Sequence, residues 1–149
     1  MEIKFIQDQN LINHEIQIEV KSNELNKEVI DLLATLEKLS SSSDLIPIKV
    51  EDQIKLVNQS EIVAVEVNDS ILTFHMLDEE IETKGNLKNI LMSLNHNFIK
   101  ISKFSIINLK KLASLEASFS GNMTSFMKNG LKITVSRRYL NDLRERIGL

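Results

Sequence analysis

The residues with the clearest chemical potential are two adjacent arginines near the C-terminal end, Arg137 and Arg138. They follow an alternating strand pattern, and Ser136 before them is a good N-cap for the short amphipathic helix expected next. The helix dipole disfavours cations in a first turn by roughly 0.3–1 kcal/mol each, so stability alone does not explain them. A helix N-terminus binds anions, and guanidinium groups added there could contact phosphates or base edges. Two solvated arginines paired with Asp142 or Glu145 are the alternative.

A lysine interrupts a strand-like pattern upstream. Apolar and polar residues alternate from Ile99 to Ser102, Lys103 takes the place of the next apolar residue, and the alternation resumes with opposite parity at Phe104. A parity change predicts a bulge or sharp bend, because successive side chains of a strand point to opposite faces. We expect the bend to present Ser102 and Lys103 outward, into a nucleic-acid groove. A solvated edge lysine is the alternative.

The net charge of −3 conceals an uneven distribution. Residues 1–82 contain 18 acidic and 6 basic residues, a net charge of −12, whereas residues 83–149 contain 3 acidic and 12 basic residues, a net charge of +9. Both arginines and Lys103 lie in the basic part. Neutralisation of phosphates requires such a basic region, so the charge pattern favours nucleic acid as a partner.

Strands must position these cations. Apolar and polar residues alternate over Ala113–Phe119, which predicts a strand whose inward-facing residues include Phe119. A second strand is expected over Met123–Lys128. Asn129-Gly130 then fits the pair of positive-φ residues of a type I′ hairpin, and Leu131–Val135 is the return strand. We therefore expect a three-stranded meander closed by the C-terminal helix.

Further strand patterns precede the basic region, so the fold class is mainly β. One of them, Ile62–Val67, is apolar on nearly both faces, which predicts a central position between layers. Asn86 should cap a short helix. The other expected strands are Leu45–Val50, Gln53–Val57, Ile71–Met76 and Ile81–Lys84.

Residues 1–44 form a separate acidic segment. Strand patterns over Met1–Gln7 and His14–Val20 and a helix over Asn23–Leu39 predict a small β-β-α extension, followed by a serine linker at 40–43. A unit of this size cannot build an independent core. The apolar stripe of the helix should therefore pack on the rest of the chain or on a second copy, as a dimerisation or regulatory element.

Nothing in the sequence indicates catalysis. His14, His75 and His96 lie in separate elements without metal-ligand spacing, and no phosphate-binding or nucleophile motif occurs. We expect no enzyme activity, no metal and no cofactor. The chain has no cysteine and no long apolar run, so we expect a soluble, cytoplasmic protein.

The chain from about Leu45 onward resembles the LytTR DNA-binding domain of bacterial transcription regulators, of the short stand-alone type with an N-terminal extension and no receiver domain. The residues that carry the resemblance are Phe98, Lys100, Ser102, Lys103, Ile106-Ile107-Asn108 and Ser136-Arg137-Arg138-Tyr139, with Ile62–Val67 and Gly85-Asn86-Leu87 upstream. It implies a LytTR-like β-sheet sandwich with short helices over residues 45–149, preceded by a small α+β extension over residues 1–44.

The resemblance also implies a site and partners. DNA contacts are expected from the loop with Asp69 and Ser70, from the Ser102-Lys103 segment and from the first arginine of the Ser-Arg-Arg motif. The implied DNA-binding residues are Ser70, Lys100, Ser102, Lys103, Arg137 and Arg138. They imply a regulator that inserts loops into major grooves of double-stranded DNA at repeated half-sites, as a homodimer, with a small membrane regulatory protein as a further possible partner. The alternative is a protein-interaction module of the same fold that does not bind DNA.

Overall fold

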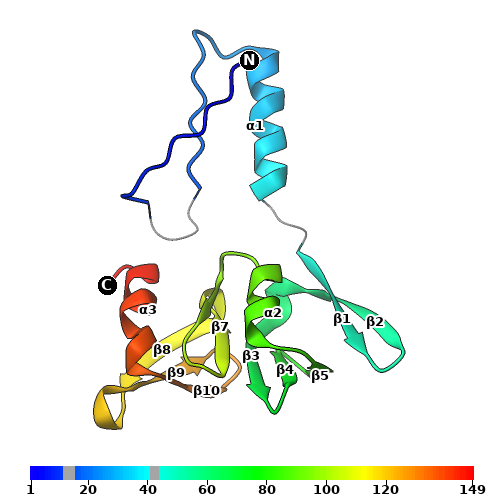
Figure 1. The fold of residues 1–149 in the computed structure, drawn as a ribbon, viewed down its shortest axis with the longest axis vertical. Coiled ribbons are helices and arrows are strands. Elements are labelled where there is room, and N and C mark those ends of the chain that lie inside the picture. The colour runs from blue at the N-terminus through cyan, green and yellow to red at the C-terminus, as the bar shows by residue number, and fades with distance from the viewer. Residues whose placement is uncertain (12–15, 41–43) are drawn as a thin grey trace. The chain divides into compact units, whose positions relative to one another are not determined.

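The computed structural model describes residues 1–11, 16–40 and 44–149, and the chain divides into two compact units, Met1–Ser40 and Ser41–Leu149 (Figure 1). The described part of the first unit contains one helix, α1 (Lys27–Ser40). The second unit contains ten strands and two short α-helices within residues 44–149. The prediction of a mainly β fold with minor helices is therefore confirmed.

The first unit differs from its expected β-β-α pattern. Residues 1–11 and 16–20 form no strand, and His14-Glu15 lies outside the described residues. An alternating sequence becomes a strand only when another strand accepts its backbone hydrogen bonds, and the described part of this unit supplies none. The helix begins at Lys27 rather than near Asn23, because Asn26 caps it: the Asn26 side chain accepts a hydrogen bond from the amide of Val29 over 3.1 Å.

None of the side chains in residues 1–11 and 16–37 of the first unit is buried. On helix α1, Val29, Leu32 and Leu36 of the predicted apolar stripe are half-buried and Leu33 is exposed, as is Ile30 outside the stripe. Leu25 lies before the helix. Alternate apolar residues of the N-terminal segment, such as Ile3 and Phe5, are almost fully exposed. Burial of each such side chain would stabilise the protein by about 1.5–3 kcal/mol, so this unit retains unused hydrophobic surface.

A five-stranded antiparallel sheet forms the centre of the second unit. The strand order is β5-β4-β3-β7-β6, so β3 is the central strand, as its apolar sequence predicted. The strands are β3 (Ile62–Asn68), β4 (Ile71–Met76), β5 (Glu80–Lys84), β6 (Phe98–Lys100) and β7 (Ser105–Asn108).

One face of this sheet packs against a hairpin and a helix. The hairpin joins β1 (Leu45–Val50) and β2 (Gln53–Asn58), and the helix is α2 (Leu87–Ser93). As predicted, Asn86 caps α2, since its side chain accepts a hydrogen bond from the amide of Asn89 over 2.9 Å. The buried side chains of this first core include Ile46, Ile48, Val57, Ile62, Val65, Phe74 and Leu87.

The other face packs against a three-stranded antiparallel sheet of order β10-β9-β8 and helix α3. A register shift between Ile62 and Ala64 in the pairing with β4 lets β3 serve both layers: Val63 and Ala64 belong to the second core, whereas Ile62 and Val65 belong to the first. The elements are β8 (Leu112–Ala117), β9 (Met123–Met127), β10 (Lys132–Val135) and α3 (Leu140–Arg146). The expected meander closed by a helix is present.

Two details of the meander correct the sequence analysis. The turn between β9 and β10 is not type I′: only Gly130 has a positive φ (88°), and Asn129 instead accepts a hydrogen bond from the amide of Leu131. It is a three-residue loop, since Gly130 N donates to Met127 O and Met127 N to Leu131 O. Phe119, expected to face inward, is 92% exposed, because β8 ends at Ala117 and the chain turns through a 3-10 helix over Phe119–Gly121.

Candidate nucleic-acid interface

The turn that carries Ser70 lies beside the turn that carries Lys103. Asp69 and Ser70 connect β3 to β4 with positive φ angles of 46° and 64°, and both residues are exposed. The amide of Val67 donates a hydrogen bond to the carbonyl of Phe104 over 2.9 Å, just beyond the last paired residues of β3 and β7. The two turns therefore project from the same end of the five-stranded sheet.

The predicted bend at Ser102-Lys103 is a tight turn between β6 and β7. Ile101 N donates to Ser105 O over 3.0 Å, and the Ser102 side chain accepts a hydrogen bond from the amide of Phe104 over 3.1 Å. Ser102 is only 9% exposed, so the expectation that it faces outward is wrong: its hydroxyl shapes the turn. Lys103 is exposed, as expected.

Arg137 reaches this end of the sheet from a different part of the chain. Ser136 N donates to Ile101 O over 2.9 Å, which joins the end of β10 to the residue before Ser102. Arg137 N donates to Oδ1 of Asn122 over 3.1 Å. A Cβ atom added to Gly121 would lie 3.1 Å from Cδ of Arg137, so the aliphatic part of Arg137 passes directly over that glycine.

The N-terminus of α3 is built differently from the prediction. Ser136 does not cap it with its side chain, because Arg137–Tyr139 forms a 3-10 turn and α3 begins only at Leu140. Arg137 and Arg138 are exposed in that turn. Across the described ranges, neither arginine lies within 4.0 Å of a carboxylate, so the suggested pairing with Asp142 or Glu145 is not formed.

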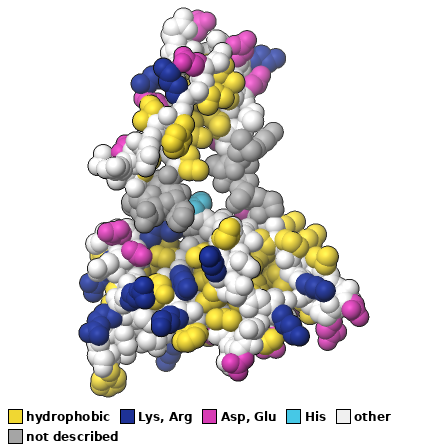
Figure 2. Space-filling view, in the orientation of Figure 1, with side chains coloured by type: hydrophobic (Ala, Val, Ile, Leu, Met, Phe, Trp, Pro, Cys, Tyr) yellow, Lys and Arg dark blue, Asp and Glu magenta, His cyan; other side chains and the backbone are white. Residues whose placement is uncertain are grey.

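Together these turns form a surface that we call the candidate edge: Asp69, Ser70, Lys103, Phe104, Arg137 and Arg138. Three segments far apart in the sequence meet there through backbone hydrogen bonds. Lys100 does not join them, because it is half-buried within β6, opposite Ile106. Lys and Arg side chains also gather over the β8–β10 and α3 part of the second unit (Figure 2).

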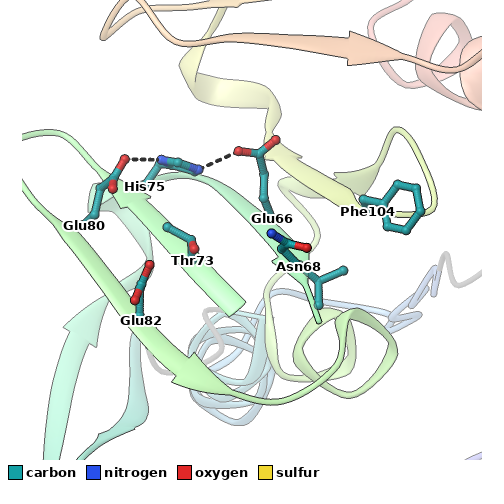
Figure 3. A pocket seen from close by; sticks show the side chains of 8 residues that line it. Glu66, Asn68, Thr73, His75, Glu80, Glu82 and Phe104 are labelled. Carbon is teal, nitrogen blue, oxygen red and sulfur yellow. Dashed lines mark hydrogen bonds and ion pairs between the residues drawn. The ribbon is translucent and has the colours of Figure 1, made fainter. Parts of the chain in front are cut away.

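A polar cluster that the sequence analysis did not identify borders the candidate edge. His75 on β4 lies between two carboxylates: Nε2 is 2.7 Å from Oε2 of Glu66, and Nδ1 is 2.8 Å from Oε1 of Glu80 (Figure 3). The hollow around them is also lined by Asn68, Thr73, Glu82 and Phe104. In the sequence, polar residues at alternate positions of β4 and β5 were the available signal for this cluster. Only the pairing of the strands shows that Glu66, His75 and Glu80 lie side by side.

The ion pair shifts the titration of both partners. The hydrogen bond to Glu66 raises the pKa of His75 above its ordinary value of 6.5, against the opposing effect of burial. The hydrogen bond to His75 lowers the pKa of Glu66 below its ordinary value of 4.5. Within residues 1–11, 16–40 and 44–149, no group of three His, Cys, Asp or Glu side chains is arranged to hold a metal ion. Its two ion pairs link β3, β4 and β5.

Asn108, a residue of the recognised motif, is structural. Its side-chain amide donates to the carbonyl of Ile62 over 2.9 Å, and its oxygen accepts from the amide of Lys110 over 3.0 Å. The residue is buried, so both bonds replace contacts with water that folding removes. The Asn108 side chain thus holds the end of β7 against the start of β3.

Comparisons with known proteins identify a family and a fold. The family described as "LytTr DNA-binding domain" matches residues 52–148. The LytTr DNA-binding domain of a putative methyl-accepting/DNA response regulator from Bacillus cereus has the same fold: the TM-score is 0.65 at 19% identity, over 72% of this chain and all of that one. None of the described helices is long and apolar enough to cross a membrane.

Two curated relatives are named as sensory transduction proteins. The sensory transduction protein LytT of Enterococcus faecalis is 32% identical over 133 residues, which are 89% of this chain and 54% of that protein. The sensory transduction protein LytR of Staphylococcus saprophyticus is 29% identical over 111 residues, 74% of this chain and 44% of that protein. This chain thus spans about half the length of these relatives. The match over residues 52–148 shows that the chain belongs to the LytTR DNA-binding domain family, and its fold is that of the solved domain.

Proposed function

We propose that this chain is a sequence-specific, DNA-binding transcription regulator that presents the candidate edge to the major groove of double-stranded DNA. One observation carries the proposal. Ser70, Lys103 and Arg137 come from three separate turns, and the bonds Val67 N–Phe104 O and Ser136 N–Ile101 O bring these turns to one end of the sheet. Family membership alone would not require that these exposed side chains meet.

The chemistry of the edge fits a groove with phosphates on both sides. Arg137 carries five N–H donors and has no carboxylate partner among the described residues, so it can donate to a guanine edge. Lys103 and Arg138 supply charge for phosphates, and the Ser70 hydroxyl supplies a neutral hydrogen bond. Asp69 makes the first turn less favourable for DNA than the other two.

The first unit supports binding as a homodimer at repeated half-sites. Its exposed apolar side chains, including Ile30 and Leu33 of α1, gain free energy when a second copy covers them. Two weakly binding domains joined in this way bind adjacent half-sites with greater combined affinity. A small membrane regulatory protein is a second candidate for the same surface. We place the action of the protein in the cytoplasm, where it meets DNA.

The test is selection of duplexes from a randomised pool by the purified full chain, followed by competition. We expect an enriched sequence whose complex resists a hundredfold excess of scrambled duplex, and a weaker, salt-sensitive interaction with the scrambled duplex itself. Arg137→Ala is the test variant and Arg144→Ala, an exposed arginine on α3, is its control.

The competing function is a protein-interaction module of the same fold. It is favoured by the acidic hollow around Glu66, Glu80 and Glu82, which repels phosphates and lies beside the edge. A folded protein that enriches no duplex even at low salt would support this second function and reject the first.

A further inference from the structure

Phe104 is an exposed aromatic side chain at the centre of the candidate edge. It follows Lys103 in the β6–β7 turn, and 63% of its surface is accessible. Figure 3 shows it at the opposite end of the hollow from Glu80, beside Asn68. Phe104 therefore marks the border between the acidic hollow and the basic part of the edge.

The backbone of Phe104 is held on both sides. Its amide donates to Oγ of Ser102 over 3.1 Å, and its carbonyl accepts from Val67 N over 2.9 Å. The side chain is consequently presented from a fixed backbone, so little backbone freedom remains to be lost on binding. Exposure of a large apolar group in a rigid turn contributes nothing to folding, but it suits contact with a partner surface.

An apolar group in the major groove has one specific counterpart. Thymine places its C5-methyl group there, and side chains such as phenylalanine recognise it by apolar contact. The groups around Phe104 are suited to the same groove, since Lys103 precedes it and Ser136 N–Ile101 O brings Arg137 to the same turn. Another protein is a less suitable partner, because the aromatic side chain lies between the carboxylates of the hollow and the exposed cations of the edge rather than within a continuous apolar surface.

We propose that Phe104 is a specificity-determining residue that contacts thymine methyl groups in the DNA sequence the protein selects. This inference rests on the proposed function. It adds an apolar contact to a set of polar and charged side chains, and it assigns a base preference that neither Lys103 nor Arg137 would give, since those residues favour phosphate and guanine.

The experiment compares wild type with Phe104→Ala on three duplexes: the one that the wild-type chain enriches, a scrambled version, and the enriched duplex with uracil in place of every thymine. We expect Phe104→Ala to bind the enriched duplex roughly fivefold to thirtyfold more weakly and the scrambled duplex less than twofold more weakly. Replacement of thymine by uracil should weaken DNA binding by wild type by a similar factor. It should leave the affinity of Phe104→Ala unchanged, because that variant already lacks the side chain that contacts the methyl group.

Leu56→Ala is the matched control. Leu56 is apolar and 65% exposed, but it lies on the β1–β2 hairpin, away from the candidate edge. The Leu56→Ala variant should bind all three duplexes as wild type does. Thermal unfolding should show that Leu56→Ala and Phe104→Ala both remain folded.

Equal binding of the enriched duplex by wild type and Phe104→Ala overturns the inference. It is also overturned if uracil substitution reduces the affinity of Phe104→Ala as much as that of wild type. Either result leaves the proposed function intact if Arg137→Ala still weakens binding of that duplex. A wild-type chain that enriches no sequence overturns both.

Discussion

The backbone amide of Arg137 donates a hydrogen bond to Oδ1 of Asn122 over 3.1 Å, which connects the start of the 3-10 turn to the end of the β8–β9 loop. The sequence placed Asn122 in a turn with Ser120 and Gly121 but not among the site residues, yet its side chain holds the backbone of Arg137 in place. Gly121 beside it leaves room for the aliphatic part of Arg137, at a φ of 76°. The position of Arg137 thus depends on a residue fifteen positions away in the sequence.

Asn122→Ala should reduce the free energy of unfolding by about 0.5–1.5 kcal/mol through the lost hydrogen bond. It should also weaken binding of the enriched duplex, though less than Arg137→Ala does, because the guanidinium is still present but less well positioned. Denaturant unfolding and duplex titration measure the two effects. The control is Asn129→Ala, which removes a comparable bond to Leu131 N in the β9–β10 turn. A similar loss of DNA affinity in Asn129→Ala would contradict a specific role for Asn122.

Arg137→Ala should cost about 1–3 kcal/mol on the enriched duplex and much less on a scrambled one, because a base-edge contact is lost. Arg137→Lys should not restore the affinity, since an ammonium group cannot donate in the bidentate geometry of guanidinium. Fluorescence anisotropy titrations with both duplexes measure this. Equal losses on the two duplexes would reduce Arg137 to a phosphate contact.

Lys103→Ala should weaken binding of enriched and scrambled duplexes alike. If Lys103 neutralises one phosphate, the slope of log affinity against log salt should decrease by about one unit. Lys132→Ala serves as the control, because Lys132 lies on β10 with its ammonium 5.3 Å from the ring centre of Phe126. An unchanged salt slope in Lys103→Ala would remove this residue from the interface.

His75→Gln should change how stability depends on pH. The raised pKa means that His75 contributes fully below its ordinary value of 6.5, and that the contribution is lost as pH rises through the higher folded-state pKa. The lowered pKa of Glu66 means that its contribution is present above 4.5 and lost as pH falls through the folded-state value. The pair is thus most stabilising between these two ordinary values.

Wild type should therefore lose more thermal stability than His75→Gln when pH is raised above 6.5, as measured by melting curves in a pH series. His96→Gln, a change at an exposed histidine after α2, is the matched control and should follow wild type. Parallel curves for wild type and His75→Gln would show that the Glu66–His75–Glu80 cluster does not stabilise the sheet.

Removal of residues 1–44 should convert a dimer into a monomer. The truncated chain should remain folded, because both buried cores consist of residues between Ile46 and Leu143. The deleted part carries 9 acidic and 4 basic residues, so the net charge changes from −3 to +2. Sedimentation of the full chain and of residues 45–149 measures the change. If both are monomeric at tens of micromolar, the extension does not mediate dimerisation.

A merely repulsive effect of the extension is distinguishable from dimerisation. Loss of its negative charge alone would strengthen binding of any duplex at low salt, with a gain that shrinks as salt rises. Loss of a dimer contact would instead weaken binding of a repeated site relative to a single half-site. Titration of both duplexes at two salt concentrations separates the two.

The sequence by itself determined the elements of residues 45–149. Alternation of apolar and polar residues located the strands from Leu45 to Val135, because burial of one face leaves a period of two. Asn86 marked a helix start, since its side chain satisfies a free amide of the first turn. Ile62–Val67, which is apolar on nearly both faces, was correctly expected to be the central strand, and the recognised motif identified the family.

Tertiary structure alone decided which side chains meet. Alternation gives the face of a residue but not the strand that pairs with it, so the N-terminal segments without partners stayed unpaired, and Glu66, His75 and Glu80 came together unforeseen. Turn geometry decided that Ser102 is buried. Long-range hydrogen bonds, from Ser136 to Ile101 and from Val67 to Phe104, decided that Arg137, Lys103 and Ser70 share one edge, because such bonds depend on how two sheets pack and not on the order of residues along the chain.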